Sequence, residues 1–145
     1  MTPSLPPQIL VVEDNPADIE LTLEAFREAS IAADIHAVKD GEEAIRFLRR
    51  EHELADSPRP DLVLLDLNLP RKDGRAVLAE IKADPALRRI PVVVLTTSSS
   101  TEDIDAAYDH HANAYIQKPV GFRDFVNVAG AIRDFWLGTA SLPGE

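Results

Sequence analysis

Short apolar runs that stop abruptly at polar residues recur along this 145-residue chain, with amphipathic stretches between them. Unbroken apolar runs are typical of strands that are covered on both faces, as in a parallel sheet. Five such strands alternating with five helices predict an α/β fold: a doubly wound five-stranded parallel sheet with helices on both faces. The predicted strands are Ile9 to Val12, Ile35 to Val38, Asp61 to Asp66, Pro91 to Thr96 and Ala114 to Pro119.

Apolar residues at three- or four-residue spacing mark the helices between these strands. In the first helix, Pro16 stands in the first turn, and Ile19, Leu23 and Phe26 share one face. The polar segment 49–60 is expected to be a long loop or a frayed helix end. The last helix is expected from Phe122 to Leu137, with a core-facing stripe of Phe122, Phe125, Val126, Ala129, Ile132 and Trp136.

Residues 8–138 are expected to form one domain, with an N-terminal tail at 1–7 and a C-terminal tail at 139–145. The chain starts without the basic and apolar regions of a signal peptide, and no apolar run approaches the roughly 20 residues of a membrane-spanning helix. We therefore expect a cytoplasmic protein. Its 25 acidic and 15 basic residues give a net charge of −10. That charge disfavours nucleic acid and anionic membranes as partners.

Chemically useful polar residues stand at the carboxyl ends of four predicted strands. Glu13 and Asp14 follow the first strand, and Asp66 ends the third. Thr96 ends the fourth strand, and Lys118 lies in the fifth. Because ligands bind beyond the carboxyl ends of the strands in an open parallel sheet, we expect these side chains to gather at one edge.

A divalent cation is the simplest compensation for three carboxylates at one place, since each would otherwise need its charge neutralised or its proton kept. Oxygen ligands without His or Cys favour Mg²⁺ or Mn²⁺ over Zn²⁺. The Lys118 ammonium and the Thr96 hydroxyl would then hold the oxygens of a phosphoryl group. One carboxylate would be the nucleophile and form an aspartyl phosphate.

Four motifs contain these residues: Val-Val-Glu13-Asp14-Asn, Leu-Leu-Asp66-Leu-Asn68-Leu-Pro70 with Gly74 beyond it, Val-Leu-Thr96, and Tyr115-Ile-Gln-Lys118-Pro119. Together they resemble the receiver domain of bacterial two-component response regulators, from about Gln8 to Leu137. The resemblance implies the flavodoxin-like strand order 2-1-3-4-5, which the sequence pattern alone does not give. It also implies a stand-alone response regulator of a phosphorelay, phosphorylated by a sensor histidine kinase and without turnover of an external substrate.

By this resemblance Asp66 is the phosphoacceptor. Asp14, Asp66 and the backbone carbonyl of Asn68 are expected to bind Mg²⁺, with Glu13 contributing through a water molecule. Glu13 departs from the Asp that is commoner in the family, but its longer side chain still reaches a metal-bound water. Asn68 and Ser98 match the positions that tune the lifetime of the phosphoryl group.

The resemblance also implies a switch. Lys118 is expected to hold a phosphoryl oxygen, with its peptide bond to Pro119 in the cis form typical of the family. Thr96 is expected to move toward the phosphoryl group, and Tyr115 to follow through its rotamer. The surface of the fourth helix, last strand and last helix would change for an unidentified downstream protein. Thr97 replaces the small residue usual after the threonine, which predicts slower phosphoryl access.

Three further features resemble the regulators that are paired with bacterial phytochrome histidine kinases. They are the long segment 51–60, the sequence Thr96-Thr97-Ser98, and a C-terminal extension that ends at Glu145 without an output domain. The resemblance implies a bacteriophytochrome as the partner kinase.

Three consecutive large apolar residues, Phe135, Trp136 and Leu137, end the last predicted helix. Successive residues on a helix are about 100° apart, so these three side chains cannot all face one core. At least one is expected to point outward, and Leu142 lies just beyond. We predict that these four residues belong to the interface of a symmetric homodimer, which also uses the last helix and its neighbours.

Each motif taken alone has a simpler interpretation. Glu13 and Asp14 could cap a helix, and Asp66 could form a turn. Thr96 could be an ordinary strand residue, and Lys118 a surface residue before a proline. Their joint occurrence in this order favours the receiver interpretation.

Three other functions share part of the pattern. A haloacid-dehalogenase-type phosphatase also forms an aspartyl phosphate, but it needs a general acid at the position of Asn68. A nucleotide-binding module needs a glycine-rich loop where Glu13-Asp14-Asn15-Pro16 stands. A degenerate receiver that serves only as a scaffold would not need the full set of Asp66, Thr96 and Lys118.

Overall fold

Five strands form one parallel sheet in the order β2-β1-β3-β4-β5 in the computed structural model, which describes residues 5–144. The predicted doubly wound fold and its strand order are confirmed. The strands are β1 (Gln8–Val12), β2 (Asp34–Val38), β3 (Leu62–Leu65), β4 (Val92–Thr96) and β5 (Ala114–Gln117). The helices are α1 (Pro16–Glu28), α2 (Gly41–Arg49), α3 (Gly74–Ala83), α4 (Thr101–Asp109) and α5 (Phe122–Asp134), with a 3₁₀ turn η1 (His52–Leu54) and a π turn η2 (Phe135–Thr139).

The predicted tails are described only in part, because residues 1–4 and Glu145 lie outside the described residues. The division into one domain and two tails stays a prediction. Within residues 5–144, no helix combines the length and the apolar character needed to cross a membrane.

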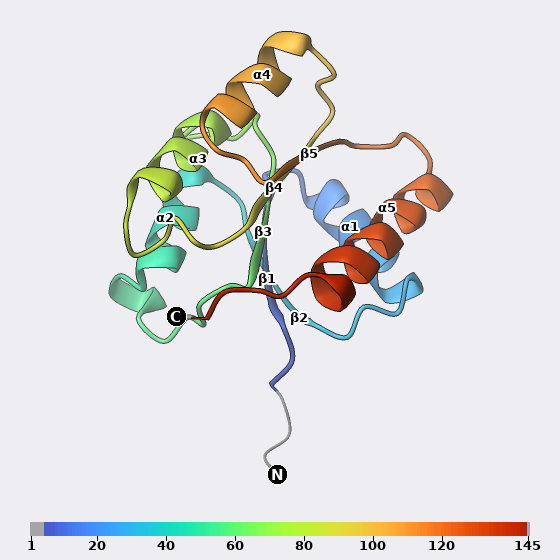
Figure 1. The fold of residues 1–145 in the computed structure, drawn as a ribbon, viewed down its shortest axis with the longest axis horizontal. Coiled ribbons are helices and arrows are strands. Elements are labelled where there is room, and N and C mark those ends of the chain that lie inside the picture. Colours follow the sequence, from blue (N-terminus) through green and yellow to red (C-terminus); the bar gives the residue numbers. More distant parts are fainter. Residues whose placement is uncertain (1–4, 145) are drawn as a thin grey trace.

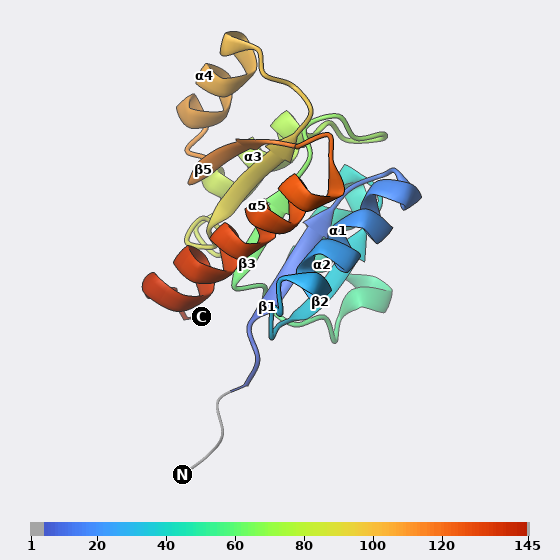
Figure 2. The same cartoon turned by 90° about the vertical axis from the view of Figure 1, so that its right-hand side faces the viewer.

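Helices cover both faces of the sheet, α1 and α5 on one side and α2, α3 and α4 on the other (Figures 1 and 2). Side chains of the central strands alternate between two clusters of buried apolar residues. Leu64 packs in the cluster of Phe26 and Phe125, whereas Leu65 packs in the cluster of Leu78. This burial on both faces explains why the central strands are apolar without interruption.

Four helices, α1 to α4, have an N-cap residue whose side chain accepts backbone N–H groups of the first turn. The Asn15 side chain accepts two backbone N–H groups of the first turn of α1, at 2.9 and 3.3 Å. Because Asn15 satisfies these donors, the interpretation of Glu13 and Asp14 as capping residues is wrong. Both acids remain available for other contacts at the end of β1.

The last helix buries Phe125, Ala129 and Ile132 against the sheet, but Phe122 is 43% exposed. The prediction that Phe122 faces the core is wrong, because this first residue of α5 lies largely at the surface, whereas Phe125, three residues later, is buried. Val126 is only partly buried against the same cluster.

The three apolar residues after α5 divide between the core and the surface. Trp136 and Leu137 pack against the cluster between α1 and α5. Phe135 is 52% exposed and meets the Trp136 ring edge-on, with 5.1 Å between the ring centroids. The prediction that at least one of the three points outward is confirmed.

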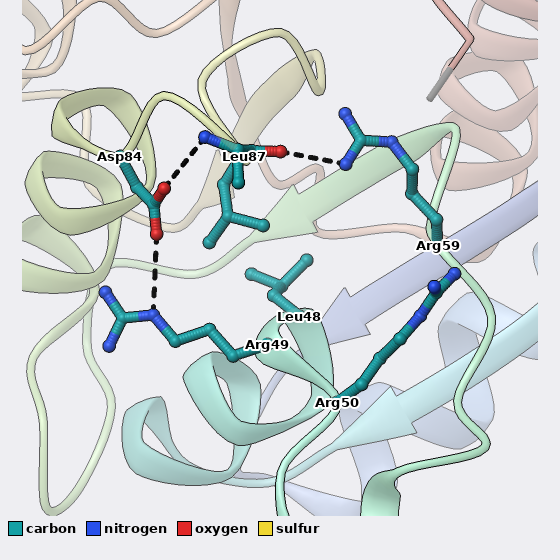
Figure 3. Close-up of a pocket in the computed structure, with 7 residues that line it drawn as sticks. Leu48, Arg49, Arg50, Arg59, Asp84 and Leu87 are labelled. Carbon is teal, nitrogen blue, oxygen red and sulfur yellow. Dashed lines mark hydrogen bonds and ion pairs between the residues drawn. The ribbon is translucent and has the colours of Figure 1, made fainter.

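A pocket of about 290 Å³ lies beside the amino ends of β3 and β4, where the segment 49–60 crosses the chain after α3 (Figure 3). Arg59 donates to the carbonyl of Ala86 at 2.9 Å. Arg49 forms ion pairs with Glu80 at 3.0 Å and with Asp84 at 3.5 Å. The segment predicted as a long loop contains one 3₁₀ turn, and these arginines fasten it to α3 and its C-terminal connection.

Candidate functional site

Three carboxylates meet at the carboxyl edge of the sheet. Glu13 and Asp14 follow β1, Asp66 follows β3, and one ligand oxygen of each lies within 4.8 Å of the others. Glu13 and Asp66 are only 3% and 8% exposed, whereas Asp14 faces solvent. Buried carboxylates at this spacing repel one another unless a cation lies between them, and oxygen ligands suit Mg²⁺ and Mn²⁺. The donor set therefore fits the predicted divalent cation.

Lys118, directly after β5, reaches into this cluster. Its ammonium contacts Glu13 Oε1, lies 3.1 Å from Asp66 Oδ2 and lies 3.5 Å from Asp18 Oδ2. Asp18 was not predicted, since only the packing of α1 beside the strand ends places its carboxylate here. The Lys118 ammonium thus lies close to three carboxylates, and Asp14 adds a fourth to the cluster, which therefore carries an excess of negative charge.

Burial decides the protonation of the Glu13–Lys118 pair. Burial raises the pKa of Glu13 to about 7, against the opposing effect of the hydrogen bond and charge of Lys118. Burial alone would lower the pKa of Lys118, but its contacts with Glu13 and Asp66 outweigh that effect and raise the pKa above its usual value. Lys118 therefore stays charged, and Glu13 is the group that gains or loses a proton near neutral pH.

The loop after β3 presents Asp66 and Asn68 to the same edge. Asp66 Oδ1 accepts the backbone N–H of Asn68 at 3.2 Å, so Asp66 does form a turn, while its Oδ2 faces Lys118. Two glycines pack closely against the backbone of this loop. A Cβ at Gly74 would lie 2.1 Å from the Asp66 carbonyl oxygen, and a Cβ at Gly41 would lie 2.0 Å from the Lys72 carbonyl oxygen. Close backbone packing therefore fixes the path of this loop at Asp66 and at Lys72.

Thr96 is fully buried at the end of β4, and its hydroxyl is the one buried side-chain oxygen or nitrogen in residues 5–144 without a hydrogen-bond partner. Its backbone carbonyl accepts the Lys118 N–H at 2.7 Å, which joins the two strand ends. Tyr115 is partly buried on β5, and its hydroxyl donates to the Ser98 carbonyl at 2.8 Å. A buried hydroxyl without a partner is costly, so Thr96 Oγ1 is poised to accept or donate a new bond.

The expected cis peptide bond between Lys118 and Pro119 is wrong for this structure, because no peptide bond in residues 5–144 is cis. The trans form is the more stable one even before proline, and Lys118 reaches Glu13 and Asp66 with it.

A family model described as the response regulator receiver domain matches residues 9–129. The chain belongs to the response regulator receiver family. Response regulator Rcp1 from Synechocystis sp. is 48% identical over 141 residues, which cover 97% of this chain and 96% of Rcp1. The receiver is thus a response regulator of two-component signalling.

Two solved structures resemble this receiver along almost all of its length. The phosphorylated cyanobacterial phytochrome response regulator RcpA matches with a TM-score of 0.91 and 51% identity, over 97% of this chain and 100% of RcpA. The Mn²⁺-bound form of Rcp1 matches with a TM-score of 0.89 and 47% identity, over 96% of this chain and 100% of Rcp1.

The predicted interface residues lie apart from the site. Phe135, Trp136 and Leu137 form the turn after α5, and Leu142 is partly buried in the segment that follows. In Figure 1 the chain that follows α5 lies at the opposite end of the sheet from the loop that follows β5. Two groups in the surroundings of Thr96 and Tyr115, the predicted switch residues, were not predicted: Arg75 of α3 and Asp103 of α4. Their 28-residue separation in sequence left no local signal of the contact.

Proposed function

We propose that Asp66 of this receiver accepts a phosphoryl group from a sensor histidine kinase, with Lys118 and Thr96 holding the phosphoryl oxygens. One observation carries the proposal: Asp66 Oδ2 lies 3.1 Å from a buried ammonium, inside a cluster of carboxylates. A nucleophile, a cationic group and an unbonded hydroxyl at one strand edge are the parts that phosphoryl transfer needs.

In the proposed reaction, an Asp66 carboxylate oxygen attacks the phosphorus of a phosphohistidine in line. An O–P bond forms while the N–P bond breaks and leaves its electron pair on the kinase imidazole. Lys118 stabilises the charge of the phosphoryl oxygens, and Thr96 Oγ1 gains a partner. Hydrolysis by water restores Asp66, so the receiver catalyses its own modification rather than the turnover of an external substrate.

The residues that would hold Mg²⁺, or Mn²⁺ in its place, are Asp14, Asp66 and the backbone carbonyl of Asn68, with Glu13 acting through a water molecule. When bound, the cation neutralises the carboxylates and the phosphoryl oxygens during transfer. The excess of four carboxylates over one ammonium supports this assignment.

Phosphorylation with acetyl phosphate and Mg²⁺, followed by intact-mass spectrometry, tests the phosphoacceptor. The unmodified chain should gain one phosphoryl group, and Asp66→Asn should gain none. Asp56→Asn, an exposed aspartate in the segment 49–60, is the matched control and should react at the normal rate. Uptake by Asp66→Asn would exclude Asp66 as the acceptor.

A phytochrome-type histidine kinase is the proposed phosphoryl donor. Support comes from RcpA, a phytochrome response regulator with 51% identity to this chain. Radiolabelled phosphotransfer from a purified phytochrome kinase should be faster than from a histidine kinase without a chromophore domain. Equal rates from both kinases would contradict the pairing. The cytoplasmic location and the downstream protein partner stay predictions.

We further propose a symmetric homodimer that uses Phe135, Trp136, Leu137 and Leu142. The exposed Phe135 ring lies against a partly buried Trp136, which leaves an apolar surface at the end of α5. Burial of such a surface against a second copy removes apolar area from water. Light scattering should show weaker self-association for Phe135→Ala and for a chain that ends at Leu137. An unchanged dimer in both variants would contradict this interface.

A further inference from the structure

A chain of side-chain hydrogen bonds joins the first turn of α3 to the loop that follows Thr96. Arg75 donates to Asp103 Oδ1 through Nη2 at 2.8 Å and through Nε at 3.3 Å. Asp103, in the first turn of α4, accepts the Ser98 hydroxyl on its other oxygen at 2.7 Å. Arg75, Asp103 and Ser98 are called the loop latch below.

Ser98 connects the loop latch to the switch residues. Its carbonyl accepts the Tyr115 hydroxyl at 2.8 Å, and its hydroxyl also accepts the N–H of Ser100 at 3.2 Å. Thr96 lies two residues before Ser98, and its own hydroxyl has no partner in residues 5–144. The position of the loop is therefore set by Asp103 and Tyr115 rather than by the Thr96 hydroxyl.

The contacts of the loop latch are charge-assisted. The hydrogen bonds from Ser98 and from Arg75 lower the pKa of Asp103, so this group is a carboxylate at neutral pH. Hydrogen bonds to an ionised partner are stronger than neutral ones. Arg75 follows Gly74, whose backbone packs against the carbonyl of Asp66, so the latch starts from a fixed point beside the phosphoacceptor.

We propose that Arg75 is a positioning residue that holds the Thr96 loop and Tyr115 in their unphosphorylated arrangement through Asp103 and Ser98. This inference rests on the proposed switch role of Thr96 and Tyr115. To bond a phosphoryl group, Thr96 moves toward Asp66, and Ser98 has to follow. Contacts made only before that movement oppose it, so the loop latch weakens the response to phosphorylation and its opening strengthens it.

Binding of beryllofluoride, a phosphoryl mimic, in the presence of Mg²⁺ tests the loop latch in the full chain. Arg75→Gln and Asp103→Asn should each bind it about threefold to tenfold more tightly, the effect of one net hydrogen bond on an equilibrium. The two substitutions change the net charge in opposite directions, so a shared direction excludes a general charge effect. Arg27→Gln, which breaks an exposed pair with Glu24 on α1, is the matched control and should leave the affinity unchanged.

Nuclear magnetic resonance of labelled tyrosines supplies a second readout without metal or beryllofluoride. The chain has two tyrosines, and exposed Tyr108 serves as the internal reference. Opening the latch should move the Tyr115 resonances toward their beryllofluoride-bound positions, and Arg75→Lys should move them less than Arg75→Gln. Ser98→Ala, which removes one hydroxyl, should act in the same direction and covers the case in which a charge variant fails to fold.

Unchanged affinity together with unchanged Tyr115 resonances would overturn the inference, and so would opposite effects of Arg75→Gln and Asp103→Asn. These outcomes differ from failure of the proposed function. If the unmodified chain does not bind beryllofluoride, or if Asp66→Asn binds it equally well, the phosphoacceptor proposal fails as well.

Discussion

The two edges of the sheet both collect charged side chains, and they differ in balance. At the carboxyl edge the Lys118 ammonium is close to three carboxylates, those of Glu13, Asp18 and Asp66. Asp14 adds a fourth carboxylate to the same cluster. Glu13, Asp66 and the Lys118 side chain are almost fully buried, so water does little to screen the repulsion.

At the amino edge of the sheet, the positive and negative side chains are paired. Arg49 is paired with Glu80, and Figure 3 shows its second pair, with Asp84, and the bond from Arg59 to a backbone carbonyl. These side chains are partly exposed, and surface ion pairs of this kind contribute little each. The unbalanced, buried edge is therefore the one whose charge suits the proposed cation and phosphoryl group. The balanced edge fastens the segment 49–60.

Removal of the single ammonium at the carboxyl edge should have the largest effect. Lys118→Met leaves Glu13 and Asp66 buried without a cation, which should lower the free energy of unfolding in EDTA by about 3 kcal/mol. The rate of phosphorylation by acetyl phosphate should fall by about 100-fold, because the phosphoryl oxygens lose their cationic partner. The control is Lys39→Met, at an exposed lysine, which should change neither urea unfolding nor the rate of phosphorylation. A normal phosphorylation rate in Lys118→Met would contradict the proposed contact of Lys118 with the phosphoryl group.

Addition of Mg²⁺ should neutralise the excess of carboxylates at the carboxyl edge and so stabilise the folded chain. A cation that binds only the folded chain raises the free energy of unfolding by about 2.7 kcal/mol at a concentration of 100 Kd. Asp14→Asn should lose most of this stabilisation, whereas NaCl at equal ionic strength should not reproduce it in the unmodified chain. Thermal unfolding with each salt measures the effect. Equal stabilisation of the unmodified chain and Asp14→Asn would remove Asp14 from the set of ligands.

The raised pKa of Glu13 predicts a pH dependence with a definite sign. A carboxyl group whose pKa rises from 4.5 to about 7 on folding binds its proton more tightly in the folded chain. Its contribution to stability is present at low pH and is lost as the pH rises through 7. Between pH 5.5 and 8, metal-free protein should lose about 2 kcal/mol relative to Glu13→Gln. Urea unfolding of both proteins in EDTA measures this difference, and parallel pH profiles would contradict it.

Substitutions at the amino edge, where the charges are paired, should have the smallest effect on stability and phosphorylation. Arg59→Gln loses one hydrogen bond to a carbonyl, which should lower the free energy of unfolding by about 1 kcal/mol or less. Phosphorylation by acetyl phosphate should keep its normal rate, because the pocket lies at the other end of the strands. A slower rate in Arg59→Gln would show that the two edges are coupled.

The sequence predicted which residues end the strands, because a buried strand and the polar residue after it are local features. Because the carboxyl ends of parallel strands lie at one edge of the sheet, the predicted strand ends also predicted that Glu13, Asp66 and Lys118 lie together, as they do. The strand order itself came from a family resemblance, since apolar runs carry no information about which strands are neighbours.

Contacts that helix side chains make with other parts of the fold could not be predicted in the same way. Asp18 near Lys118, and Arg75 near Asp103, depend on how the helices pack on the sheet, and no spacing in the sequence records that packing. Phe122 fitted the helical stripe of α5 but is exposed, because periodicity gives the face of a helix and not where along that face the core ends.

Gly41 and Gly74 pack directly against the backbone of the loop after β3, and this packing limits which substitutions the site tolerates. Any side chain at Gly41 or Gly74 would strike a carbonyl oxygen at 2.0 or 2.1 Å, whereas Pro70 and Arg71 between them are exposed. In a saturation library, substitutions at the loop tip should survive selection for metal uptake, and replacements of either glycine should be depleted. The strictest requirement of the site would then fall on two residues that never touch the phosphoryl group.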